Sequence, residues 1–165
     1  QMQQHYQANL IGSITKTGSG SYNVKVRSAT NNCVVSVSAN GRGLGSKKFR
    51  VKSVPNPVAT IGAPGSAYFK GGRIPKSTLL ALSGINATME NFDFDLRFNI
   101  TKFTVTCSIG GFDESQSSNG RSFTPAQKNI IRQARQNTRV IIENIKARGP
   151  DGTVRKLNDL VLKLR

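Results

Sequence analysis

Alternation of apolar and polar side chains over residues 92–109 constrains the fold of this chain more than any other feature. Even-numbered positions are apolar up to residue 100, whereas odd-numbered positions are apolar from residue 103 onward. A period of two places one set of side chains on a buried sheet face and the other set in solvent. The change of phase near Thr101 and Lys102 predicts a β-bulge or a bend in a long strand.

One clear helix is predicted over residues 122–135, "SFTPAQKNIIRQAR". Thr124 is placed to act as the N-cap, Pro125 suits the first helical position, and Gln127 completes a capping box with Thr124. The side chains expected to face the core recur at helical spacing, and they are Ile130, Ile131 and Ala134.

Two further features complete the predicted C-terminal part. A short helix is expected within residues 77–84, with Ser77 as its cap and Gly84 as its stop. Residues 139–149 and 159–165 are separated by a Gly/Pro-rich turn, and they are expected to form a closing hairpin.

Short alternating runs separated by turns fill the N-terminal third of the chain. Residues 22–26, 33–37 and 47–54 are predicted strands, and Asn40 and Gly41 form the strongest short hairpin signal in the sequence. The rhythm is that of a β-meander in an immunoglobulin-like sandwich, which needs about 100 residues. The three or four strands expected here cannot bury a sheet face alone, so the missing strands are either truncated away or supplied by another chain.

The predicted fold class is therefore mainly β, or α+β, in two parts. Residues 1–53 are interpreted as the C-terminal part of a truncated immunoglobulin-like β domain, that is, a partial β-sandwich. Residues 54–165 are interpreted as a β-rich terminal α+β domain with one clear helix.

A proline-bearing seam lies between these two parts. Pro55 and Pro57 have a fixed φ and cannot donate to a β-ladder, and Val54 and Asn56 are held extended because each precedes a proline. We predict a short, stiff connector and a candidate interdomain hinge at these four residues. The alternative is a proline pair on an edge strand within one domain.

Positive charge is the strongest compositional feature. The chain has 24 Lys and Arg against 8 Asp and Glu, a net charge of +16, and its first carboxylate is Glu90. Such a field favours an acidic protein, nucleic acid, lipid headgroups or polysaccharide as a partner, although it also serves solubility alone. The candidate basic interaction patch lies on the helix and the following strand, and its alternative is a solvated surface: Arg132, Arg135, Arg139, Lys146 and Arg148.

Catalytic and metal-binding patterns are poorly represented. His5 is the only histidine, and Cys33 and Cys107 belong to no Cys/His cluster, so the sequence predicts no enzyme, no metal site and no cofactor. The two cysteines are expected to be small buried hydrophobic residues, with a disulfide between them as the alternative. The spacing of Asp93 and Asp95 could suit glycoside hydrolysis, but their alternation with Phe92 and Phe94 is fully explained by a solvated outer strand face.

Four stretches point to a family: "FRVKSVPNPVATIG", "GINATMENFDFDLRFNITKFTV", "FTPAQKNIIRQAR" and "ENIKARGPDGTVRKLNDLVLKL". They resemble the C-terminal periplasmic region of the GldM/PorM proteins of the type IX secretion and gliding machinery of Bacteroidetes. The similarity is closer to PorM, and it extends from Phe49 to Arg165.

The resemblance implies a non-enzymatic structural component of the periplasm. The full-length protein would be anchored in the inner membrane by an N-terminal helix, and its periplasmic domains would stack into a dimeric rod. The rod would link a PorL/GldL-type motor protein to PorK/PorN-type ring proteins under the outer membrane, with this chain as its distal part. The alternative function is a basic module that binds polyanions or nucleic acid.

Overall fold

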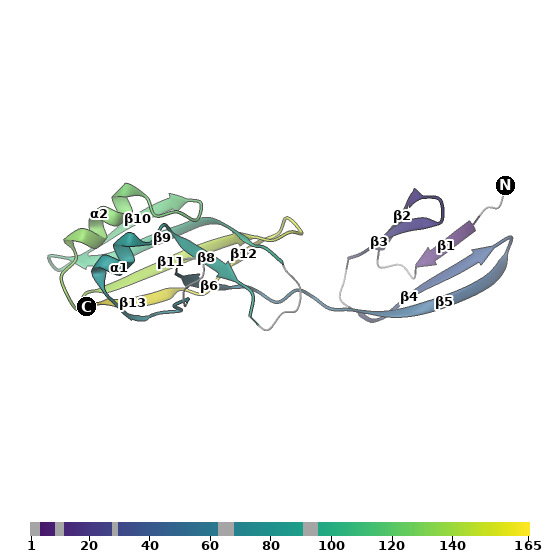
Figure 1. Cartoon of the computed structure of the whole chain (residues 1–165), viewed down its shortest axis with the longest axis horizontal. Coiled ribbons are helices and arrows are strands. Elements are labelled where there is room, and N and C mark those ends of the chain that lie inside the picture. Colours follow the sequence, from purple (N-terminus) through teal and green to yellow (C-terminus); the bar gives the residue numbers. More distant parts are fainter. Residues whose placement is uncertain (1–3, 9–11, 28–29, 63–67, 91–95) are drawn as a thin grey trace. The chain divides into compact units, whose positions relative to one another are not determined.

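The structure is a computed structural model that describes residues 4–8, 12–27, 30–62, 68–90 and 96–165. The chain divides into two compact units, Gln1–Val54 and Pro55–Arg165, whose elements are drawn in Figure 1. Strands dominate the described residues of both units, and the mainly β fold class predicted from the sequence is confirmed.

The first unit consists of two small antiparallel sheets. One has the strand order β1-β4-β5 and the other pairs β2 with β3. The strands are β1 (Gln4–Ala8), β2 (Gly12–Gly18), β3 (Ser21–Val26), β4 (Thr30–Ala39) and β5 (Arg42–Val51). The predicted hairpin is confirmed, because Asn40 and Gly41 both have positive φ, at 51° and 75°, and Ala39 pairs with Arg42.

The prediction of three or four strands for this region was wrong, since the described residues form five. The sequences of β1 and β2, "QHYQA" and "GSITKTG", carry too few apolar side chains to show a clear alternation. The predicted meander was also wrong, because β3 pairs with β2 whereas β4 pairs with β1 and β5. No side chain among residues 12–27 and 32–54 is buried, so these residues enclose no core of their own.

The second unit is built on one mixed sheet of strand order β10-β9-β11-β13-β7, with β12 paired to β11 beside this path. Strands β6 and β8 form a separate antiparallel pair. The elements are β6 (Val58–Ile61), β7 (Gly72–Ile74), α1 (Lys76–Ala81), β8 (Ile85–Thr88), β9 (Asn99–Ile109), β10 (Phe112–Asn119), α2 (Pro125–Gln133), β11 (Arg139–Arg148), β12 (Val154–Lys156) and β13 (Leu160–Leu164). The predicted closing hairpin is confirmed by the antiparallel pairing of β11 with β13.

One face of this sheet is covered and carries the core. Phe103 and Val105 of β9 are fully buried, and the Phe103 ring meets Phe123 edge to face at 5.5 Å. Helices α1 and α2 lie beside one another (Figure 1), and Lys76 Nζ donates to the carbonyl oxygens of Arg132 and Ala134. The core is thus covered by two helices that are inserted between strands in the sequence, α1 after β7 and α2 after β10.

The predicted irregularity in β9 is confirmed. Ile100 and Phe103 are both buried although they are three residues apart, and the ladder to β11 shifts register there. Thr101 is the extra residue, and its hydroxyl donates to the Lys146 carbonyl at 3.2 Å. The earlier part of the alternating run, which contains Asp93 and Asp95, lies outside the described residues.

The main helix is confirmed with its predicted capping box. Gln127 N donates to Thr124 Oγ1 at 3.1 Å, and Thr124 N donates to Gln127 Oε1 at 3.0 Å. Ile130, Ile131 and Ala134 are buried, as their spacing predicts. The side chain of Gln127 is also fully buried, and its Nε2 donates to the Gln116 carbonyl.

Two details of the short helix were predicted wrongly. The N-cap of α1 is Pro75, not Ser77, and no side chain caps the helix. Pro75 has an extended backbone and accepts a hydrogen bond from Leu79 N through its carbonyl, so the chain enters the helix without a polar cap. Gly84 lies beyond the helix end and bridges to Ser122, where a Cβ would collide with the Arg121 carbonyl.

Candidate interaction surface

The uncovered face of the main sheet, called here the open face, presents the polar half of each alternating strand. In β13 the three leucines are buried, whereas Val161 and Lys163 between them are exposed. Hydroxyl side chains pair across β9 and β10, with 2.9 Å between the hydroxyls of Thr104 and Ser117. An antiparallel sheet with one face packed and one face solvated produces this arrangement.

Strand register brings cations together at one end of the open face. Lys163 of β13 lies opposite Arg73 of β7 on one side and opposite Arg139 of β11 on the other. All three side chains are exposed, and no carboxylate among the described residues pairs with any of them. Like charges directly opposite one another destabilise a sheet. We call Arg73, Lys163 and Arg139 the first basic row.

A second row lies at the other end of the same face. Lys146 of β11 lies opposite Lys102 of β9 and opposite Lys156 of β12. These three side chains are likewise exposed, and none forms an ion pair with a described carboxylate. Arg139 and Lys146 are about 20 to 25 Å apart along β11 at about 3.3 Å per residue.

The predicted basic patch is therefore divided by the fold. On β11 the open face carries Arg139, Lys146 and Arg148, which alternate with buried residues. Arg139 lies at one end of this face, and Lys146 and Arg148 lie at the other end. Arg132 and Arg135 belong to α2 and the turn after it, on the covered side of the sheet. The sequence missed Arg73, Lys102, Lys156 and Lys163, because only strand pairing places them beside the residues of β11.

The centre of the open face is uncharged or acidic. Ile141 and Val161 lie opposite each other between the two rows, and Val161 is 48% exposed. Between the rows, Glu143 accepts a hydrogen bond from the Thr106 hydroxyl at 2.7 Å. Asp113 lies outside this centre, on the edge strand β10 opposite Ser108, at the end of the sheet that carries the first basic row. The open face thus combines the six cations of the two rows and Arg148 with an apolar pair and two carboxylates.

The seam is anchored to the second unit by Arg155. Its Nη1 donates to the Pro55 carbonyl at 3.1 Å, its Nη2 donates to Asp151 Oδ2 at 3.2 Å, and its guanidinium lies 5.1 Å from the centre of the Phe98 ring. Pro57 is buried, whereas Pro55 and Asn56 are exposed. The hinge role of Val54, Pro55, Asn56 and Pro57 stays a prediction.

Asp151, in the turn between β11 and β12, is held in its charged form. The Thr153 hydroxyl and backbone N–H both donate to Asp151 Oδ1, at 2.8 and 3.0 Å. These two hydrogen bonds, followed by Arg155, lower the pKa of Asp151 below its ordinary value of 3.8. The turn therefore keeps a carboxylate available for Arg155.

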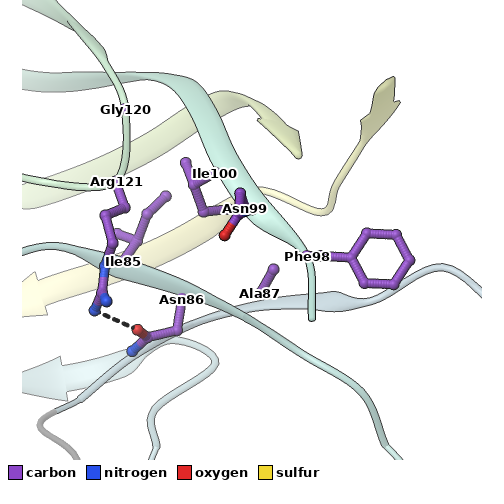
Figure 2. A pocket seen from close by; sticks show the side chains of 8 residues that line it. All are labelled: Ile85, Asn86, Ala87, Phe98, Asn99, Ile100, Gly120 and Arg121. Atoms are coloured by element: carbon purple, nitrogen blue, oxygen red, sulfur yellow. Dashed lines mark hydrogen bonds between the residues drawn. The ribbon is translucent and has the colours of Figure 1, made fainter. Parts of the chain in front are cut away.

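A cavity of about 380 Å³ opens beside the start of β9. Figure 2 shows the eight residues that line it, which are Ile85, Asn86, Ala87, Phe98, Asn99, Ile100, Gly120 and Arg121. Arg121 donates to Asn86 Oδ1 at 2.7 Å, and Asn86 Nδ2 donates to the Gly62 carbonyl at 3.3 Å. The side chains of Arg121 and Asn86 thus link β8 to the segment after β10 and to the end of β6.

Both cysteines are free thiols, so the alternative of a disulfide between Cys33 and Cys107 is not realised. The expected burial is confirmed for Cys107 but was wrong for Cys33, which is only half-buried. The Cys107 thiol donates weakly to the Ile130 carbonyl at 3.5 Å. Burial, followed by the charges of Glu114 and Asp113, raises the pKa of Cys107. The Cys107 thiol therefore packs as a small apolar group.

The described side chains and helices lack two further kinds of feature. They contain no group of three or more His, Cys, Asp and Glu residues placed to hold a metal ion. They also contain no helix with the length and apolar character of a membrane span.

The fold and its surface define a β-rich domain with one helix-covered sheet face and one open, cation-bearing face. The family model of the GldM C-terminal domain matches residues 55–165, and the chain belongs to this family. Membership indicates a structural component of the type IX secretion and gliding machinery, in which this domain is periplasmic. No curated protein matches the chain. The closer similarity to PorM stays a prediction.

Proposed function

We propose that this chain is the distal part of a dimeric periplasmic rod of the type IX secretion machinery, with no enzymatic activity of its own. The observation that carries the proposal is the match of the GldM C-terminal domain family to residues 55–165. In the full-length protein an N-terminal helix would anchor the rod in the inner membrane beside a PorL/GldL-type motor protein. The end formed by this chain would meet the PorK/PorN-type ring proteins.

The construction of the seam supports a rod. A rod passes on force or a conformational change only when each joint is held firmly to the domain that follows. Arg155 holds the Pro55 carbonyl, and Ala59 N donates to Asn158 Oδ1 at 2.8 Å. The chain entering the second unit is thus restrained by hydrogen bonds between its backbone and the side chains of Arg155 and Asn158, as well as by its two prolines. The first unit would be the last part of an immunoglobulin-like domain.

Binding to the ring protein tests the proposal directly. The purified chain is titrated with a purified PorN-type ring protein at physiological salt, and with a random DNA duplex in parallel. We expect a Kd of about 1 μM or tighter for the ring protein, with weaker DNA binding that falls steeply as salt rises. Binding to DNA alone would contradict the proposal and favour a polyanion-binding module.

Self-association is tested on the same protein. Sedimentation equilibrium of the chain over a range of concentrations reports whether it pairs with a second copy. A dimer supports the dimeric rod at its distal end, whereas a monomer would assign dimer formation to other parts of the full-length protein.

A further inference from the structure

The strongest feature that the proposed function leaves unexplained is the pair of basic rows on the open face. Six exposed Lys and Arg side chains are held in two directly registered triplets, although each triplet repels itself. Solubility does not require this arrangement, because scattered charges serve it equally well. Repulsion between registered cations is relieved when anionic groups lie against them.

We propose that the open face is the docking surface for an acidic protein surface, whose carboxylates lie against both basic rows. The inference rests on the proposed function, because it takes the ring protein as the partner. Five strands at about 4.8 Å spacing and a ten-residue β11 give a face of roughly 20 by 30 Å. That is close to the area that each partner contributes to a standard protein interface.

The centre of the face favours a protein over a nucleic acid or another polyanion. Ile141 and the exposed Val161 offer apolar contact between the rows, which a phosphate backbone cannot use. Glu143 at the centre and Asp113 at the β10 edge of the same face repel phosphates, whereas a protein surface can place a hydrogen-bond donor opposite them. An apolar centre with a charged periphery is also the usual anatomy of a protein interface.

Three matched variants test the proposal. The first changes Arg73, Lys163 and Arg139 to Gln, and the second changes Lys102, Lys146 and Lys156 to Gln. The control changes Lys128, Arg132 and Arg135 to Gln, so it removes the same charge from the helix side. Circular dichroism melting is measured for each. We expect each row variant to melt at or above the temperature of the unchanged protein, because exposed like-charge pairs are removed.

Affinity for the PorN-type ring protein is then measured by calorimetry at two salt concentrations. We expect each row variant to weaken binding by about tenfold and to reduce its salt dependence, and the control to stay within about twofold. Row variants that bind like the unchanged protein, or a control that loses as much, would overturn the docking surface and leave the proposed function intact. Failure of the unchanged protein to bind, or tighter binding to a DNA duplex, would overturn both.

Discussion

Gln127 shows how one side chain joins a helix to the edge of the sheet. It is fully buried, it completes the capping box with Thr124, and its Nε2 donates to the Gln116 carbonyl of β10 at 3.0 Å. A buried polar group is tolerated when its hydrogen bonds are satisfied, and here a single amide satisfies one group in each of two elements. Gln127 is therefore both a cap and a core residue.

Replacing Gln127 with Leu should destabilise the second unit by about 1 to 3 kcal/mol. The volume is nearly conserved, but Thr124 N and the Gln116 carbonyl lose their partner. Urea unfolding followed by circular dichroism measures the change. Gln133→Leu at the exposed end of α2 is the matched control, and equal losses in the two variants would contradict the role given to Gln127.

Asp151 should contribute stability that depends on pH. Its pKa is lowered in the folded state, so the contribution is complete above the ordinary pKa of 3.8 and is lost as pH falls through the lower folded value. We expect the chain to lose stability over this acidic range, and Asp151→Asn to lose less. Thermal melting between pH 5 and pH 2 compares the two proteins. Parallel melting curves would show that the Thr153 hydrogen bonds do not hold the carboxylate charged.

At the scale of elements, the β11–β12 hairpin holds the part of the seam that belongs to the second unit. Arg155 of β12 contacts the seam at Pro55 and Asn56, the turn at Asp151, and the core at Phe98. A strand pair at the sheet edge thus determines how the entering chain is held. The bulge at Thr101 is a second local feature that shapes this unit. It keeps both Ile100 and Phe103 on the covered face of the sheet.

Arg155→Met should loosen the seam without unfolding the unit. Methionine keeps part of the contact with Phe98 but cannot donate to the Pro55 carbonyl. We expect faster amide hydrogen exchange at Asn56 and in the Asp151 turn, with unchanged exchange in β9. Lys156→Met, one residue further along β12, is the control and should leave the seam unchanged. Unaltered exchange at Asn56 in Arg155→Met would show that the two prolines alone restrain the seam.

At the scale of the whole molecule, the chain consists of two units that differ in whether their described side chains form a buried core. The second unit has a core of fully buried side chains, whereas no described side chain beyond residue 11 in the first unit is buried. The boundary between the two units falls between Val54 and Pro55, within the proline-bearing seam. Stiffness of this seam is therefore the property of the whole chain that a rod would require.

Changing Pro55 and Pro57 together to Gly should impair type IX secretion while both units stay folded. Glycine gives the seam backbone freedom that proline denies, and Pro55 is exposed whereas Pro57 is buried. Secretion is measured in cells that carry the double variant in the full-length protein, and circular dichroism checks the purified chain. Normal secretion would remove the stiff joint from the proposed mechanism.

The sequence by itself determined what depends on near neighbours. The capping box of α2, the Asn40–Gly41 turn and the change of phase in β9 each involve residues a few positions apart, and all three agree with the structure. The strand order of the first unit and the Pro75 cap were not predicted correctly, because β1 and β2 have weak patterns and the cap has no polar side chain.

Only the tertiary structure decided which cations meet on the open face. Alternation alone indicates that Lys163 faces away from the core, but nothing near it in sequence points to Arg73 or Arg139. Strand pairing between distant segments follows from how the whole sheet buries its apolar face, and the polar side chains take whatever neighbours that pairing provides. The arrangement of charged side chains on this surface therefore depends on strand register, which local sequence patterns do not predict.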